Sequence, residues 1–186
     1  DFGKPWARKS MCDLVKEKTG IDFLAIETAE EARNAAKKIG VHTEEGLKWG
    51  QIVAEVFDER VEDSLIQPIH VTDLPTDVSP LSKPHEDNPR LVERFETFIN
   101  GWEVANAFSE LNDPKVQYER FMEQVAQGEA GDEEAQMLDA DYITALEIGL
   151  PPNGGWGLGI DRLVMLLTNS SNIRDVICFP TLKPKK

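Results

Sequence analysis

Two glutamates flank the dipeptide Asn100-Gly101 and could together bind a hard cation. Asn-Gly lies between two strand-like runs, residues 94–99 and 102–108. This arrangement predicts a hairpin, because the type I′ turn of a two-residue loop needs a positive φ at both central residues. The hairpin would bring the glutamates, Glu96 and Glu103, close to each other.

In a regular hairpin Glu96 faces Ala105, which places Glu96 and Glu103 on one face of the sheet. Diagonal neighbours of this kind lie about 7–8 Å apart at their Cα atoms and closer at their side chains. Two carboxylates at this separation can share a Mg²⁺ ion that also bridges phosphate oxygens. The alternative is that both glutamates are simply solvated on an exposed strand.

The same strand carries Asn106, Phe108 and Glu110, which are spaced by two residues and therefore share a face. An amide, an aromatic ring and a carboxylate in a row could form the wall of a pocket for a small cationic metabolite. In a regular strand these residues face away from Glu103. A single site therefore requires a bulge or bend between Glu103 and Asn106.

A glycine-rich segment follows later in the chain, where Gly155, Gly157 and Gly159 alternate. Their shared strand face has no side chains, so a flat ligand or another backbone can approach it closely. Arg162 comes at the start of the next helix and could offer its planar cation to a nucleotide. The segment is neither a GxGxxG fingerprint nor a P-loop. The alternative is a bulge or close sheet packing.

The elements before residue 68 are predicted to be mostly helical. Ser10 with Asp13, and Thr28 with Glu31, have the spacing of capping boxes that open helices ending near residues 18 and 40. A third helix shows the i, i+3, i+4, i+7 apolar pattern of a core-facing stripe, with charged residues outside it. The stripe consists of Trp49, Ile52, Val53, Val56, Phe57 and Val61, and the residues outside it are Glu55, Asp58 and Glu59.

The rest of the chain mixes strands and helices. A short strand is expected at 69–72, a helix after Asp113-Pro114 that ends at Gly128, and another helix at 142–148. The buried stripe of the first of these helices would be Tyr118, Phe121, Met122 and Val125, and residues 128–134 read as an acidic connector. Strands joined by a tight hairpin, outside any helix–strand alternation, predict an α+β fold with an antiparallel sheet backed by helices.

Composition excludes several function classes. The 186 residues carry 20 Lys+Arg and 34 Asp+Glu, a net charge of −14, which opposes general binding to nucleic acid. No apolar run is long enough to span a membrane. The two cysteines lie far apart, which favours a reducing, cytoplasmic setting. Three scattered histidines and no GxSxG elbow argue against a zinc site or a serine nucleophile.

Taken together, these residues resemble the lysyl-tRNA synthetases of class II. Residues 155–162, Gly-Trp-Gly-Leu-Gly-Ile-Asp-Arg, resemble motif 3 of the class, and residues 95–114 resemble the block just before it. Aspartyl and asparaginyl relatives usually have Glu before the motif 3 arginine and lack the Phe-Ser-Glu-Leu-Asn-Asp run. Further similarity lies in residues 2–6, 65–68, 79–81 and 178–184.

The resemblance implies a role for each of these site residues. Glu96 and Glu103 would bind the Mg²⁺ ions that bridge the ATP phosphates, and Gly157 and Gly159 would line the nucleotide floor. Arg162 would stack on the adenine and face the phosphates, so that Arg162 and Glu103 are the residues nearest the reaction. Asn106 would hold the carboxylate of L-lysine, Phe108 its aliphatic stem and Glu110 its ε-ammonium.

The resemblance further implies a partial class II antiparallel sheet with a helical insertion. Residues 1–19 would begin the catalytic segment, 20–66 would form the insertion, and 67–186 would form the C-terminal catalytic core. The whole enzyme would be a cytoplasmic homodimer that activates lysine with ATP and transfers it to tRNA(Lys).

Motif 1, motif 2 and the anticodon-binding barrel of the family do not occur in this sequence. The chain therefore resembles a C-terminal piece of the catalytic domain, which is not expected to catalyse alone. Two alternatives stay open: a paralogue that modifies a protein, and a non-catalytic module that binds lysine or ATP.

Overall fold

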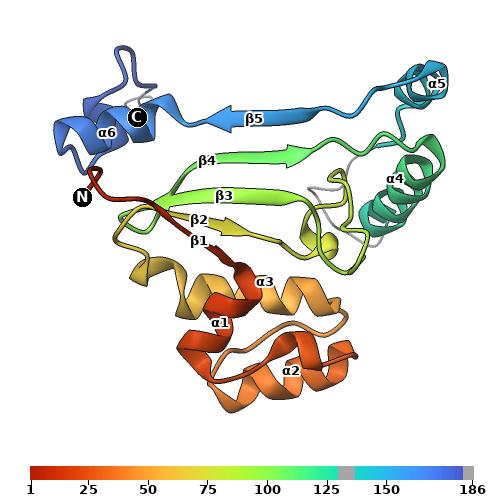
Figure 1. Ribbon diagram of the computed structural model, residues 1–186, viewed down its shortest axis with the longest axis horizontal. Helices are drawn as coiled ribbons and strands as arrows, with labels where there is room; N and C mark the ends of the chain where they lie inside the picture. The colour runs from red at the N-terminus through yellow and green to blue at the C-terminus, as the bar shows by residue number, and fades with distance from the viewer. Residues whose placement is uncertain (130–136, 182–186) are drawn as a thin grey trace, which may run out of the picture.

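The computed structural model describes residues 1–129 and 137–181 and contains a five-stranded sheet (Figure 1). The strands lie in sequence order across the sheet, and each neighbouring pair from β2 to β5 is antiparallel, whereas β1 pairs with β2 in parallel. Their bounds are Ala7–Ser10 (β1), Ile69–Thr72 (β2), Arg94–Ile99 (β3), Trp102–Ser109 (β4) and Gly154–Leu158 (β5).

Six α-helices are present in the described residues, and they confirm an α+β fold with helices flanking the sheet. They are Met11–Thr19 (α1), Ala29–Lys38 (α2), Trp49–Arg60 (α3), Pro114–Glu129 (α4), Ala140–Ile148 (α5) and Ile160–Thr168 (α6). The capping residues act as predicted, because Ser10 accepts a hydrogen bond from the Asp13 amide and Thr28 accepts one from the Glu31 amide. Within the described residues, no helix is both long and apolar enough to cross a membrane.

Strand β1 lies in the segment that was predicted to be mostly helical. Its four residues, Ala-Arg-Lys-Ser, have no apolar alternation that would reveal a strand in sequence. It forms because Ala7 aligns with Ile69 and Ser10 with Thr72 at the edge of β2. Pairing with a distant segment therefore decides the conformation here.

One hydrophobic core joins α1, α2 and α3 to a face of β2 and β3. The predicted α3 stripe is buried, and Phe57 packs edge-on against Phe98 of β3 with ring centroids 5.7 Å apart. Ile69 and Val71 of β2 belong to the same core. This packing fixes the end of α3 beside the hairpin.

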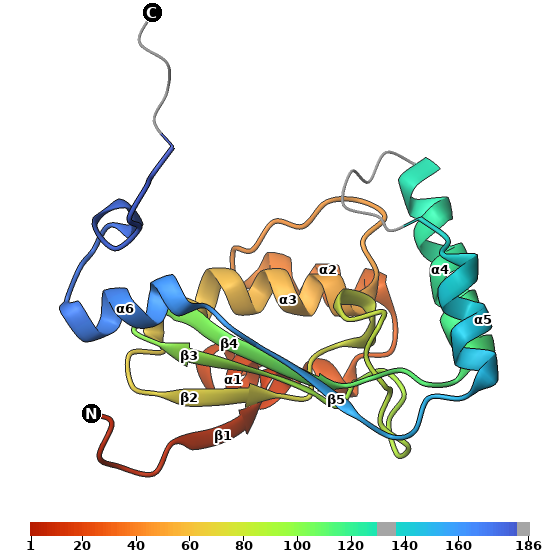
Figure 2. The ribbon, with the colours of Figure 1, turned by 90° about the horizontal axis from the view of Figure 1, so that it is seen from above.

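Helices α4 and α5 lie side by side at the end of the sheet away from α6 (Figures 1 and 2). The stripe predicted for α4 is only partly right, because Phe121 is buried whereas Tyr118 and Met122 are exposed. Gln117 takes a fully buried position instead. The main partner of α4 is α5, not the large core, so its buried face does not follow hydrophobicity alone. Helix α4 continues past Gly128, and most of the acidic connector predicted at 128–134 lies outside the described residues.

The hairpin turn forms as predicted, with φ of 57° at Asn100 and 72° at Gly101. Its register follows the prediction only near the turn, where Phe98 aligns with Glu103. A bulge at Val104 then shifts the ladder, so that Glu96 aligns with Asn106 and not with Ala105.

Candidate functional site

The bulge at Val104 brings the two predicted sets of residues onto one face. Glu96 and Asn106 are directly opposite each other, and the Asn106 amide donates to the Glu103 carboxylate over 3.3 Å. In a regular strand Glu103 and Asn106 would face opposite sides. The bend required for a single site is therefore present where it was predicted.

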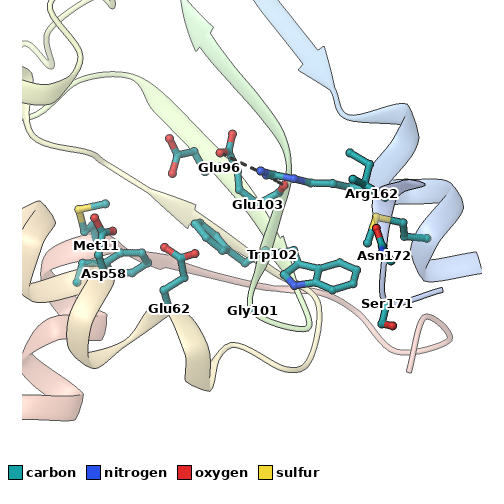
Figure 3. Close-up of a pocket in the computed structure, with 14 residues that line it drawn as sticks. Met11, Asp58, Glu62, Glu96, Gly101, Trp102, Glu103, Arg162, Ser171 and Asn172 are labelled. Carbon is teal, nitrogen blue, oxygen red and sulfur yellow. Dashed lines mark hydrogen bonds and ion pairs between the residues drawn. The ribbon is translucent and has the colours of Figure 1, made fainter. Parts of the chain in front are cut away.

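A cavity of about 810 Å³ lies at one end of this face, between the hairpin, the end of α3 and α6 (Figure 3). Glu96, Glu103 and Arg162 line it, as do Asp58 and Glu62 from α3 and the turn that follows. Among its lining residues, four carboxylates therefore accompany a single guanidinium. Such a cavity favours a ligand that brings positive charge, such as a metal–phosphate complex.

The bulge also positions Arg162. The Val104 carbonyl accepts a hydrogen bond from the Gly159 amide over 2.9 Å, which fixes the start of α6 next to β4. Arg162 then donates to the backbone carbonyl of Glu103, and its Nη1 lies 3.9 Å from a carboxylate oxygen of Glu103. The Arg162 side chain is half exposed, so part of its guanidinium can still meet a ligand.

Glu96 is held by Arg94, which the sequence reasoning missed. The Arg94 guanidinium donates to Glu96 Oε1 over 2.6 Å and to Ser79 Oγ over 2.9 Å. The Glu96 side chain is only 14% exposed, and burial raises its pKa, while Arg94 lowers it and Glu103 raises it further. A signal was available, because Arg94 precedes Glu96 by two residues and shares its strand face.

Asp58 and Glu62 were not predicted as site residues. The helical pattern of α3 placed Asp58 on the outer face, but this side chain lines the cavity from the end of the helix. Burial raises the pKa of both carboxyls, and the charges of Asp58, Asp63 and Glu103 raise that of Glu62 further. Only the packing of α3 against the hairpin brings these residues to the site.

The pair Glu96 and Glu103 fits a magnesium ion that also contacts phosphate. Mg²⁺ commonly takes one or two carboxylates and completes its shell with phosphate oxygens and water. Among residues 1–129 and 137–181, no group of three or more His, Cys, Asp or Glu is arranged as a metal site. The charge of Glu103 contributes to the raised pKa of Glu96, so a cation between the two carboxylates would relieve their repulsion.

Phe108 lies farther along β4 and Glu110 lies just past the end of that strand. Both line a second cavity, also of about 810 Å³, between the sheet and helices α4 and α5. Asn106 lies between the two cavities on the strand. The site residues predicted from sequence thus share one face but divide between its two ends.

The glycines of β5 border the same face. Gly155 aligns with Phe108 and Gly157 with Asn106. A Cβ atom at position 155 would lie 2.5 Å from a carboxylate oxygen of Glu110, so a larger residue would displace that carboxylate from its present position. At positions 157 and 159 the nearest atoms to a Cβ would be 3.7 Å and 3.6 Å away. Beside Asn106, the sheet face therefore has a floor without side chains.

The fold and this site define a class of protein. Residues 1–183 match the family model of tRNA synthetases class II (D, K and N). The chain belongs to this family of class II synthetases.

The individual relatives are all ligases for the same amino acid, lysine. The chain is 58% identical over 185 residues to a lysine–tRNA ligase of Thermoanaerobacter pseudethanolicus, and 54% identical over 182 residues to one of Carboxydothermus hydrogenoformans. It is 56% identical over 186 residues to a lysine–tRNA ligase of Trichormus variabilis. The matches cover 98–100% of this chain, but only 37%, 37% and 33% of the three relatives respectively.

Proposed function

We propose that this chain carries the ATP and lysine sites of a lysine–tRNA ligase. One observation carries the proposal: the Val104 bulge places Glu103, Asn106, Phe108 and Glu110 on one face of β4, with a cavity at each end. Two substrates that react with each other need two adjoining subsites of this kind. The similarity to lysine–tRNA ligases supports the choice of amino acid.

The first cavity would hold ATP. Glu96 and Glu103 would bind Mg²⁺, which neutralises the phosphate charge when it is bound. Arg162 would place its planar cation against the adenine and the phosphates, over the floor that Gly157 and Gly159 leave open. Arg94 would keep the Glu96 carboxylate in place.

The second cavity and the strand beside it would hold lysine. The Asn106 amide would bind the α-carboxylate, the Phe108 ring would cover the methylenes and Glu110 would pair with the ε-ammonium. The lysine carboxylate would thereby be aimed at the α-phosphate, where attack forms lysyl-adenylate and releases pyrophosphate. These residues would act by positioning and charge, so no nucleophile or general base is required.

The complete protein would then transfer lysine to tRNA(Lys) as a cytoplasmic homodimer. Residues 1–19 and 67–186 would belong to its catalytic core, and 20–66 would be the helical insertion. Because the chain spans 37% of the length of its first relatives, we expect it to bind ligands but to form no adenylate by itself.

Isothermal titration calorimetry with lysine, in the presence of Mg²⁺ and ATP, tests this proposal. Glu110→Gln should weaken lysine binding about 10–100-fold, because a charge-assisted hydrogen bond contributes about 1.5–3 kcal/mol. The matched control is Glu119→Gln, an exposed glutamate of α4 outside the second cavity.

Two results would contradict the proposal. The first is a chain that binds neither ligand, and the second is equal lysine affinity in the unaltered chain and E110Q. Rapid lysine-dependent exchange of pyrophosphate into ATP would instead show that the chain needs none of the remaining length of its relatives.

A further inference from the structure

Helices α4 and α5 form one wall of the second cavity. The proposed function gives this wall no role. On the sheet side it is lined by Phe108 and Glu110. On the other side it is lined by Gln117 and Phe121 of α4 and by Tyr142 of α5. The helix pair α4–α5 therefore closes the end of the site at which Glu110 lies.

The lining has the chemistry of a site for an aliphatic cation. Leu81, Phe108 and Phe121 supply apolar walls, and Glu110 and Asp141 supply carboxylates. Among the described lining residues there is no lysine, arginine or histidine. A chain of methylenes that ends in an ammonium group matches both the apolar surface and the charge.

Gln117 is the unusual member of this wall. Its side chain is only 1% exposed, and within the described residues its amide nitrogen has no hydrogen-bond partner. Buried amides are almost always paired, so an unpaired one beside a cavity indicates that the cavity supplies the partner. The unpaired N–H can only donate, so its partner would be an oxygen, such as that of a water that solvates a bound ammonium group. The oxygen of the same carboxamide can accept from the ammonium group itself.

Tyr142 faces the same space from α5. Its ring stands edge-on to Phe121 with centroids 6.2 Å apart, which holds it against α4. Burial raises the pKa of its hydroxyl, and the charge of Glu110 raises it further. The hydroxyl thus stays protonated and lies within the field of the carboxylate that would bind the cation.

We propose that Gln117 and Tyr142 are specificity-determining residues for the cationic end of the substrate. This inference rests on the proposed function and assigns a role to the α4–α5 pair. Glu110 supplies the charge, whereas the Tyr142 hydroxyl and the Gln117 carboxamide oxygen would accept the remaining ammonium hydrogens, and the Gln117 N–H would hold a water beside them. An uncharged analogue of the same length leaves these groups unpaired, and a site of this kind discriminates strongly against such a ligand.

Calorimetry with L-lysine and L-norleucine, which lacks the ε-amino group, measures this discrimination. Gln117→Met and Tyr142→Phe should each weaken lysine binding about 5–20-fold and change norleucine binding by less than about twofold. The affinity for ATP with Mg²⁺ should stay the same, because the first cavity is unchanged. A purely structural role would weaken all three ligands together.

The helices offer matched controls outside the cavity lining. Gln124→Met changes another glutamine of α4 whose buried amide oxygen has no hydrogen-bond partner in the described part of the chain, and Tyr118→Phe changes an exposed tyrosine of the same helix. Both should keep the preference for lysine. Circular dichroism checks the fold. If Q117M does not fold, the preference for lysine over norleucine in the smaller variant, Y142F, tests the inference.

The outcomes separate this inference from the proposed function. If the unaltered chain prefers lysine and both Q117M and Y142F keep that preference, the inference is overturned and the proposed function stands. If the unaltered chain binds no lysine, both are overturned.

Discussion

Glu96 is the side chain whose surroundings most clearly link local structure to ligand binding. It is partly buried, it receives a short hydrogen bond from Arg94, and it shares its cavity with three other carboxylates. Burial raises its pKa above the usual value of 4.5, and the Glu103 charge adds to this effect. A raised pKa means that protonation competes with cation binding at a higher pH than for an ordinary glutamate.

The affinity for Mg²⁺ with ATP should therefore depend on pH. Binding should be strong at pH 7 and should weaken as the pH falls through the raised pKa of Glu96, before it reaches 4.5, because a protonated carboxyl does not bind a cation. Glu96→Gln should weaken Mg²⁺ binding at pH 7 by about tenfold or more and reduce its dependence on pH. Titrations at several pH values measure this, and an unchanged affinity of the unaltered chain from pH 7 to 4.5 would rule it out.

The same shift affects stability with a definite sign. A carboxyl whose pKa is raised by folding favours the folded state when protonated, and this contribution is lost as the pH rises through the folded pKa. Above that pKa, the ionised Glu96 carboxylate lowers the stability of the folded chain. Carboxyl groups with pKa values shifted in this way are typical of functional sites.

At the scale of the elements, the β-bulge is the feature that assembles the site. Val104 is the extra residue of β4, and its carbonyl fixes Gly159 at the start of α6. One residue thus turns Glu103 to the face of Asn106 and anchors the helix that carries Arg162.

Deletion of Val104 should restore a regular ladder and remove the carbonyl that anchors the start of α6. Glu103 and Asn106 would then stand two residues apart and stay on one face, but Gly159 would lose its hydrogen bond and Arg162 its fixed position beside Glu103. We expect ATP binding to weaken at least about tenfold, whereas the helical signal in circular dichroism should remain. The control is Val104→Ala, which keeps the extra residue and should bind ATP within about threefold of the unaltered chain. ATP affinity in the deletion variant equal to that of this control would show that the bulge is not needed.

The elements also show how much of the structure could be predicted from the sequence. The capped helices α1 and α2, the α3 stripe and the Asn-Gly hairpin were predictable, because their signals lie within a few residues of each other. From the sequence, the bulge could be inferred only indirectly, because a single site requires a bulge or bend between Glu103 and Asn106. Strand β1, the buried Gln117 and the approach of Asp58 depend on packing between distant segments, which no local pattern encodes.

At the scale of the whole molecule, the sheet leaves one edge open. Strand β5 pairs with β4, and in the described part of the chain no strand pairs with its other edge. Trp156 of this strand is also largely exposed. Unpaired strand edges offer hydrogen-bonding groups to other chains, particularly when apolar side chains accompany them.

The isolated chain should therefore self-associate as its concentration rises. Light scattering should show a mass above that of the monomer at high concentration, and Trp156→Lys should shift the distribution back towards the monomer. The control is Tyr118→Lys, which places the same charge on α4, away from the sheet edge. A monomer at every concentration would contradict this expectation.

Strand β4 has one more consequence, which concerns the size of the proposed substrate. With Asn106 at one end and Glu110 at the other, the strand acts as a ruler of four residues, about 13–14 Å between Cα atoms. The ruler is rigid, because β4 is paired on both sides as far as Phe108 and the next residues are also held. Glu110 forms a bridge with Ser82 and donates its amide to the Asn153 carbonyl. A diamino acid one methylene shorter would meet either the amide or the carboxylate but not both. The fixed spacing of residues along the strand would then select the length of the amino-acid side chain. This selection would not require a conformational change.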